Sequence, residues 1–477
     1  MRSRVHRFLF PSLASVVVLA FACGQDATVE DPPTPIDSGP SGDATNDAPA
    51  DGNVAEAAPD VVCPEVLPDD ATGVYVTPAG INNVGCGTRA APCKTVGLGI
   101  THAAAASRAK VYVARGTYVE QVTLAAGVEV VGGWDVPAGS TKWKRTCVTP
   151  EQIVVLRAPP NQHTTVEATD LGGEAGLSLL RIESKVSAAV APGESLYGIR
   201  AVGATTTVVV NDVDVEVGNG GAGASTPNAP PGAPAPPTCP AGAGAPGAPG
   251  AHGPGAALGS FISSGYQPAV GGAGTPGAAG DNGTAGVAGT CVACGACTPF
   301  PACTFVAAAA PPACGKDGAP GCAGGAAGPG EPAAGGGSSI GIFAWDATVA
   351  INGGKIKSGD GGNGGSGGAG GAGGTATLGV VGAPTVPCVT SCAAGLLACV
   401  ETKTAGLGGA AGGPGGGGGA GGAGGGGGGG WSVGFYQGNA GLITFTPSTK
   451  MSHGKAGAGG GPVGGAGAAG AATDHVP

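Results

Sequence analysis

Glycine-rich stretches with a three-residue period set the tightest limit on how this chain can fold. The run GGNGGSGGAGGAGG, residues 361–374, has glycine at two of every three positions. Three residues per turn is the period of polyproline II. Segments of this kind can therefore pack side by side on their glycine faces. Disorder is the alternative, because glycine loses more conformational entropy on ordering than any other residue.

The rest of the composition confines a hydrophobic core to a few segments. Glycine and proline together account for 142 of the 477 residues, while aromatic residues make up 4% and charged residues 11%. Such values belong to low-complexity chains rather than to ordinary globular domains. Any core must come from the strand-like segments that separate the glycine-rich runs.

The N-terminus has the features of an export signal. Three arginines in MRSRVHR precede an apolar run from Phe8 to Phe21, which is shorter than the roughly 20 residues of a membrane-spanning helix. The stretch Ala20–Cys23 resembles the lipobox of bacterial lipoproteins, although leucine is usual at Ala20 and a smaller residue at Phe21. The resemblance implies that residues 1–23 are a lipoprotein signal peptide with a lipidated Cys23, anchored in the outer membrane at the cell surface. A plain signal peptide cleaved near Ala22 is the alternative.

Residues 24–71 form a predicted disordered acidic tether. They contain twelve Asp or Glu and no Lys or Arg, against a net charge of −10 for the whole chain. Proline, self-repulsion and a shortage of large apolar residues keep such a segment extended and unfolded. No part of the chain is basic enough for a nucleic-acid partner.

Cysteine usage also indicates export. Fourteen of the fifteen cysteines remain if Cys23 carries lipid, and an even number in an exported chain suggests disulfides. We expect the pairs Cys86–Cys93 and Cys63–Cys147. The disulfide candidates are Cys63, Cys86, Cys93, Cys147, Cys239, Cys291, Cys294, Cys297, Cys303, Cys314, Cys322, Cys388, Cys392 and Cys399.

Short apolar runs separated by glycine predict an all-β body that begins over residues 72–217. Val111–Val113, Val122–Leu124 and Val128–Val131 are typical of short strands at close spacing. Farther along, Leu177, Leu179 or Leu180, and Ile182 are candidates to face the core, with Arg181, Glu183 and Lys185 pointing outward. In NDVDVEV, Val213, Val215 and Val217 alternate with acidic residues, as in a half-buried strand.

A family resemblance gives this pattern a specific architecture. The segments GVYVTPAGINNVGCGTRAAPCKTV and VYVARGTYVEQVTLAAGVEVVGGWD resemble the start of pectin-lyase-like right-handed parallel β-helix proteins, close to the DUF1565-like bacterial surface group. The resemblance covers residues 73–143. It implies a right-handed parallel β-helix, with a short capping helix between Val96 and Ala109 closing the N-terminal end of the solenoid.

Three later stretches share one form, which predicts repeated rungs of this solenoid. They begin at Ser195, Ser339 and Ser432, and each carries an early and a late glycine separated by 20, 18 and 20 residues. About 20 residues make one turn in the families that the chain resembles, and a rung needs a stacked neighbour to bury its face. The prediction places rungs at 338–358 and 431–453 and long glycine-rich insertions, similar to the PGRS type, at 218–337 and 359–430. A glycine-rich tail follows at 454–477. All the insertions leave from one corner of the solenoid.

Candidate ligand and metal sites are few. Asp212, Asp214 and Glu216 are a speculative ligand face, since hydrolases of this fold can use rows of acids, but the solvated side of an alternating strand is the preferred interpretation. The CVACGACTPFPAC spacing could begin an iron–sulfur or zinc site, yet Cys303 is followed by Thr, and the second pair that zinc would need is only the loosely spaced CVTSC. Disulfides are the preferred interpretation, with no metal and no cofactor.

No acid–base or nucleophile set is visible in the sequence. Four tryptophans, at 134, 143, 345 and 431, are the residues that could line a carbohydrate groove. The leading hypothesis is a non-enzymatic cell-surface lipoprotein with an adhesive or envelope-structural role, whose partners would be surface glycans or matrix. A carbohydrate-active β-helix protein, either a polysaccharide lyase or hydrolase or a glycan binder, is the alternative.

Overall fold

The computed structural model describes residues 67–137, 140–145, 154–461 and 463–477. Among these residues α1 (Val96–Ala105) is the one α-helix, a 3-10 turn occupies Ser187–Ala189, and almost everything else that is regular is strand. The fold is therefore largely β. The predicted signal peptide, Cys23 and the predicted Cys63–Cys147 pair lie outside the described residues.

Most strands belong to three mainly parallel sheets. The first sheet contains, in spatial order, β1 (Gly73–Val76), β2 (Lys110–Ala114), β5 (Glu129–Asp135), β9 (Gly173–Ser178), β12 (Thr206–Asn211), β21 (Thr348–Asn352) and β26 (Leu442–Phe445), with β6 (Lys144–Arg145) antiparallel to β5. The second contains β3 (Gly116–Val119), β7 (Val154–Arg157), β10 (Arg181–Glu183), β13 (Asp214–Glu216), β22 (Lys355–Lys357) and β27 (Lys450–Ser452). The third contains β4 (Val122–Thr123), β8 (Thr164–Thr169), β11 (Leu196–Val202), β20 (Ser339–Trp345), β25 (Ser432–Gly438) and β28 (Ala472–Val476).

The chain visits these sheets in a fixed rotation. From β2 onward each parallel strand of the first sheet leads to one of the second and then one of the third, as in β9, β10 and β11; β6 and the hairpins of the glycine-rich segments stand outside this order. Each new strand pairs in parallel with the strand laid down one cycle earlier. Successive cycles therefore add one strand to the same edge of every sheet.

The three predicted repeats lie in register on neighbouring strands. Ile199 of β11 is the partner of Ile342 of β20, which is the partner of Phe435 of β25. The following strands continue the stack, with Val208 beside Val349 and Val349 beside Ile443. The predicted stacking of the repeats is confirmed, even though glycine-rich chain separates them.

One hydrophobic cluster receives side chains from all three sheets. Val208 of the first, Ile182 of the second and Ile199 of the third are fully buried members of it. The predicted inward residues Leu177, Leu180, Val213, Val215 and Val217 are buried there as well. Leu179 instead occupies a turn with φ of 56°, so Leu180 is the inward residue of the pair.

Helix α1 packs at the edge where this core begins. Val96, Ile100 and Ala103 belong to the same cluster, and the helix contacts β1, β2 and β4. Thr95, at the N-cap, makes no side-chain cap. Glu120 takes that role, accepting hydrogen bonds from the backbone N–H groups of Val96 and Gly97 at 2.8 and 2.9 Å. The helix ends at Ala105, four residues before the predicted end, and Ser107 has a φ of 52°.

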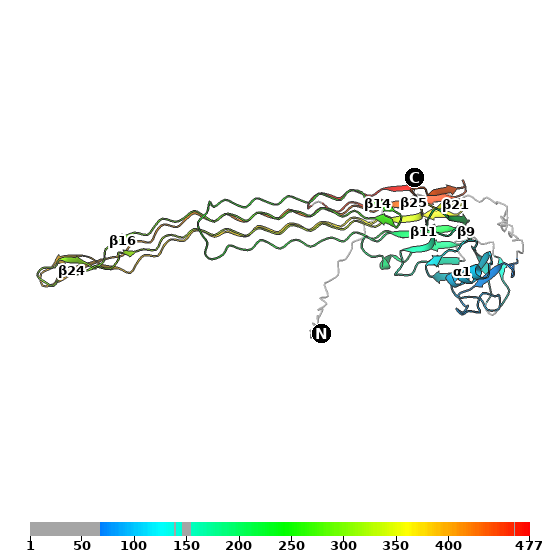
Figure 1. Ribbon diagram of the computed structural model, residues 1–477, viewed down its shortest axis with the longest axis horizontal. Coiled ribbons are helices and arrows are strands. Elements are labelled where there is room, and N and C mark those ends of the chain that lie inside the picture. Colours follow the sequence, from blue (N-terminus) through cyan, green and yellow to red (C-terminus); the bar gives the residue numbers. More distant parts are fainter. Residues whose placement is uncertain (1–66, 138–139, 146–153, 462) are drawn as a thin grey trace, which may run out of the picture. The chain divides into compact units, whose positions relative to one another are not determined.

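The glycine-rich segments leave the sheets at a single corner. The first runs from β13 to β20, the second from β22 to β25 and the third from β27 to β28, so each connects the second sheet to the third. Figure 1 shows the segments lying side by side between the sheets and the hairpins near β16 and β24. The predicted common corner is observed.

These segments form a hydrogen-bonded bundle with a three-residue period. Gly247, Gly250 and Gly253 donate N–H bonds of 2.8–2.9 Å to the carbonyls of Gly417, Ala420 and Ala423. Both chains advance by three residues at each bond, which is the repeat of polyproline II. The expected packing on glycine faces is thus realised, and the backbone donors that a strand ladder would satisfy are satisfied between segments.

Glycine content follows the number of neighbours that a segment has. In GAPGAPGAHG one position in three is glycine, and a Cβ on Gly247 would lie 2.1 Å from the carbonyl oxygen of Ala278. The run 412–430 contains only three other residues, Pro414, Ala420 and Ala423. It exchanges hydrogen bonds with several segments, including those that contain Gly247, Ala278, Gly330 and Gly371. A run with neighbouring segments on most sides has almost no space for side chains.

The predicted insertions and tail contain additional strands. The hairpins are β14 (Ser260–Ile262) with β15 (Gly265–Gln267), β16 (Cys291–Val292) with β19 (Ala313–Cys314), β17 (Gly295–Cys297) with β18 (Phe305–Ala307), and β23 (Cys388–Ala394) with β24 (Cys399–Thr404). At the C-terminus, β28 returns to the third sheet and pairs with β25. The segment 431–453 is therefore followed by one further strand of the stack rather than by a tail alone.

Candidate functional site

The predicted acidic face lies at the second sheet, but its three acidic residues do not all lie on one strand. Asp214 and Glu216 lie on β13, whereas Asp212 occupies the preceding turn with a φ of 49°. Asp214 accepts a 2.9 Å hydrogen bond from the backbone N–H of Lys355. The three acids are therefore not one row on a strand face.

Glu216 is paired with cations on both neighbouring strands. Its carboxylate lies 2.6 Å from Arg181 of β10 and 3.0 Å from Lys357 of β22. The hydrogen bond from Lys357 and the charge of both cations lower the pKa of Glu216. Burial, by contrast, raises the pKa of Asp214.

These pairs continue as a ladder of alternating charge across the sheet. Glu183 of β10 lies beside Glu216 in register and contacts Arg157 of β7 at 2.6 Å and Arg181 at 2.9 Å. Arg181 thus sits between two carboxylates, which reduces the repulsion between them. The hollow lined by Arg181, Asp214, Glu216, Lys355 and Lys357 has a volume of about 160 Å³, below the roughly 300 Å³ typical of a small-molecule site. Mutual neutralisation of stacked charges is the chemistry that this arrangement supports best.

Lys185, predicted to point outward, is buried. Its side chain is 4% exposed, and its ammonium lies 2.6 Å from Glu194 and 3.0 Å from the carbonyl oxygen of Pro160. Glu194 also accepts a hydrogen bond from the N–H of Ala191. The prediction failed because the alternation along β10 ends at Glu183, and the loop after it buries both Ser184 and Lys185.

The four tryptophans that could line a carbohydrate groove pack mainly against other side chains, and Trp143 also borders a hollow of about 520 Å³ with Arg89 and Lys142. Trp134 and Trp143 are buried in one cluster with Tyr75 and Tyr112. Trp345 and Trp431 pack against a second cluster, which contains Tyr197, Tyr266 and Phe343. The β14–β15 hairpin covers this second cluster, with Phe261 stacked on Tyr436 at 3.8 Å between ring centroids. The rings are used for packing.

The described cysteines are joined in pairs. Cys86 bonds Cys93, the pairing expected from the sequence. The ten later cysteines pair only with one another, and their bonds are Cys239–Cys322, Cys291–Cys314, Cys294–Cys388, Cys297–Cys392 and Cys303–Cys399. The last three bonds join the first glycine-rich insertion to the second.

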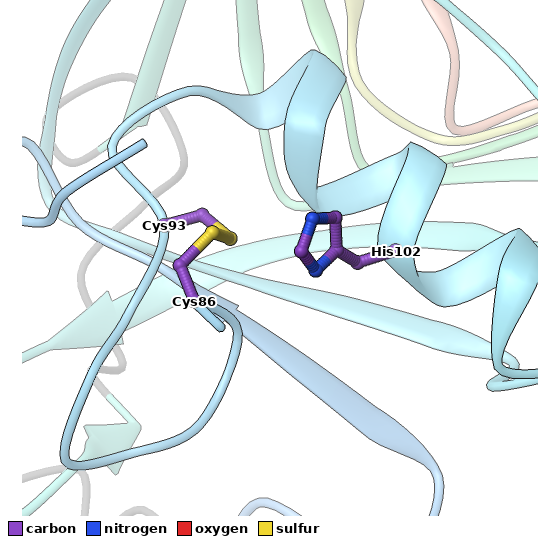
Figure 2. Close-up of side chains that lie close together, drawn as sticks. All are labelled: Cys86, Cys93 and His102. Atoms are coloured by element: carbon purple, nitrogen blue, oxygen red, sulfur yellow. A yellow bond between two sulfur atoms is a disulfide. The ribbon is translucent and has the colours of Figure 1, made fainter. Parts of the chain in front are cut away.

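These bonds remove the sulfur ligands that a metal would need. Each cysteine of CVACGACTPFPAC is in a disulfide, and metals bind the thiolate form of cysteine. Figure 2 shows one further group, in which His102 of α1 lies beside the Cys86–Cys93 bond, with all three ligand atoms within 4.8 Å of one another. Its two sulfurs are bonded to each other, so His102 is the one ordinary metal ligand of that group.

Four of the disulfides define a compact head. We use the name disulfide head for residues 291–314 and 388–404, which include three of the hairpins. Large apolar side chains are exposed on it, namely Phe300, Val306, Leu396, Leu397 and Val400. The sequence patterns described above did not predict this surface. The Leu pair between Gly395 and Ala398, in an otherwise side-chain-poor region, is the signal that could have revealed it.

Comparison of the chain with protein-family models, curated proteins and solved structures finds no match. In the described part of the chain, no helix has the length and apolar character needed to cross a membrane. The class of protein is therefore defined by its architecture: a stack of parallel strands that carries a glycine-rich bundle and a disulfide head.

Proposed function

We propose that this chain is a non-enzymatic cell-surface lipoprotein, anchored in the outer membrane through Cys23, with an adhesive or envelope-structural role. The observation that carries the proposal is the bundle: three glycine-rich connections leave one corner of the sheets and form one hydrogen-bonded unit. From Leu407 to Gly430, a polyproline II rise of about 3.1 Å per residue gives the last long segment a length of about 70 Å. A spacer of that length between a rigid body and a disulfide head suits contact at a distance from the membrane.

The body of the proposed protein is a closed right-handed parallel β-helix of the pectin-lyase-like type. Support comes from the fixed rotation of the chain through three parallel sheets and from the single cluster that all three sheets share. Helix α1 would cap the first rung, since it packs against β1, β2 and β4 where an unpaired edge would otherwise be open. A solenoid of this kind is a stiff base for long insertions.

A carbohydrate-active protein is the alternative, and it would bind beside Asp214 and Glu216. The pairing of Glu216 with Arg181 and Lys357 makes this role less favourable, because a ligand would have to displace two ion pairs. Binding to acidic polysaccharides that is lost in an Asp214→Asn, Glu216→Gln double variant would favour this alternative over the leading proposal.

Cell fractionation tests the anchor. The wild-type chain should sediment with outer membranes, and Cys23→Ser should be released, since it keeps the export signal but lacks the thiol that receives lipid. Cys86→Ser is the matched control: it also removes one cysteine and should stay with the membrane. Equal membrane association of wild type and Cys23→Ser would contradict the proposed anchor.

A further inference from the structure

The end of the β23–β24 hairpin exposes two adjacent leucines almost completely. Leu396 is 97% exposed and Leu397 is 90% exposed. They lie in the turn between Ala394 and Cys399, which are the last paired residues of the hairpin. Large apolar side chains in this position normally mark a contact surface rather than packing within the fold.

The turn that carries these leucines is held in place. The N–H of Gly395 donates a 2.9 Å hydrogen bond to the carbonyl of Ala398, which closes the turn beneath the two side chains. Cys399 is bonded to Cys303 and Cys392 to Cys297, so the hairpin is attached to the neighbouring hairpin β17–β18. The leucines are therefore presented by a restrained backbone, which lowers the entropy that a contact would cost.

The surface around the turn is uncharged. No Asp, Glu, Lys or Arg occurs from Cys291 to Cys314 or from Cys388 to Val400. The first charged residue of β24 is Glu401, which pairs with Cys392, two residue pairs away from the turn. Phe300, Val306 and Val400 are exposed on the same head.

We propose that the disulfide head docks on a lipid bilayer by inserting Leu396 and Leu397 among the acyl chains. The turn protrudes and is apolar, and a bilayer rejects charged side chains most strongly, so the charge-free surface matches this occupant. The ladder between β23 and β24 and the Gly395–Ala398 hydrogen bond pair part of the backbone, which lowers the cost of a shallow insertion. The charge of Glu401 limits the depth of insertion into the bilayer to the turn. Because no Lys or Arg lies between Cys388 and Val400, and Lys403 pairs with Val389 at the other end of the hairpin, the turn recognises hydrocarbon rather than anionic headgroups.

This inference deepens the proposed adhesive function by naming what the head contacts, and it rests on that function only for its biological setting. The anchor and the head are separable. The purified full chain with Cys23→Ser has no N-terminal lipid, so its binding to vesicles reports on the head, while fractionation of cells reports on the anchor.

The test is flotation with phosphatidylcholine vesicles. The Cys23→Ser chain should float with vesicles, and adding Leu396→Ser and Leu397→Ser should weaken binding by about tenfold or more, since each leucine loses its burial in hydrocarbon. Val84→Ser is the matched control: Val84 is 98% exposed but lies in the loop between β1 and α1, and this variant should bind as well as its parent. Peptide mapping under non-reducing conditions verifies that all variants keep the head disulfides.

Lipid composition and depth give two further readouts. Vesicles that contain phosphatidylglycerol should not bind better, and 1 M NaCl should not weaken binding. A Leu397→Trp variant should keep binding and be quenched by brominated acyl chains. Absence of flotation, or equal flotation of the double leucine variant, would overturn the proposal. Self-association that needs the two leucines but occurs without vesicle binding would assign the surface to a second copy instead.

Discussion

Ile199 and Ile342 are register partners on adjacent strands, although the whole first glycine-rich insertion lies between them in the sequence. Both side chains are fully buried in the cluster shared by the three sheets. The insertion therefore does not interrupt the core. The chain leaves the stack after β13 and resumes it at β20, in the same register that a short connection would give.

This contact predicts energetic coupling across the insertion. Ile199→Ala and Ile342→Ala should each lower the free energy of unfolding by about 2–5 kcal/mol, because each leaves a cavity in a packed core. The double variant should deviate from additivity by about 0.5–3 kcal/mol, as expected for side chains in contact. Denaturant titration of the four proteins of the cycle measures both quantities. Strict additivity would show that the two residues are not neighbours.

Adjacent glycines of the bundle should differ sharply in their tolerance of alanine. A Cβ on Gly418 would lie 1.9 Å from the carbonyl oxygen of Gly325, whereas a Cβ on Gly417 would meet nothing closer than 3.7 Å. Gly418→Ala should therefore destabilise the bundle by about 1–3 kcal/mol or more, while Gly417→Ala should be neutral or stabilise it by up to about 1 kcal/mol.

Hydrogen exchange of the bundle amides measures this difference. Protection of the N–H groups of Gly247 and Gly250, which bond the same run, should fall in Gly418→Ala and persist in Gly417→Ala. Similar exchange in the two variants would mean that the run is not enclosed on its glycine faces.

The sequence was sufficient to predict the repeats and their stacking for a simple physical reason. Alternation such as that of Val213, Val215 and Val217 marks a face that must be buried, and only a neighbouring repeat can bury it. The three-residue period of the glycine runs likewise predicted their packing, because period and side-chain volume are local properties of a sequence. The Cys86–Cys93 pair closes a short loop and was within reach of the same reasoning.

Features that depend on distant partners could not be predicted. Lys185 is buried with Glu194 and Pro160 as its polar partners, and no local sequence pattern predicts those contacts. The pairing of Cys294, Cys297 and Cys303 with Cys388, Cys392 and Cys399 depends on how two insertions align in the bundle. The pairing of β28 with β25 has the same origin, since ATDHV carries little strand signal of its own.

Acid should reduce stability through Glu216. Its pKa is lowered by Lys357 and Arg181, so the ion pairs contribute stability above its ordinary pKa, near 4.5, and this contribution is lost as the pH falls below that value. Glu216→Gln should lower the thermal midpoint at pH 7, and the difference from wild type should shrink at pH 3. Because the side chains are partly exposed, 1 M NaCl should shrink it as well.

Asp214→Asn provides the matched contrast on the same strand. Burial raises the pKa of Asp214, so ionisation opposes folding and the associated stability is lost as the pH rises. The asparagine side chain still offers an oxygen to the N–H of Lys355 and carries no charge. This variant should therefore be as stable as wild type, or more so, at pH 7. A pH-independent difference for both variants would contradict the assigned roles.

The disulfides should be reduced in an order set by their exposure. Cys291 and Cys314 are exposed, whereas Cys86 and Cys93 are 6% and 0% exposed. A reductant thiolate must reach a sulfur atom to exchange with it, so the Cys291–Cys314 bond should open first and the Cys86–Cys93 bond last. Timed reduction with dithiothreitol, trapping with an alkylating reagent and peptide mass mapping give the order directly.

Loss of the three bonds that join the insertions should make residues 388–404 sensitive to protease while the strands around Ile199 stay protected, because those bonds close loops of more than 90 residues. Simultaneous loss of the head and the sheets would show instead that the two regions unfold as one unit.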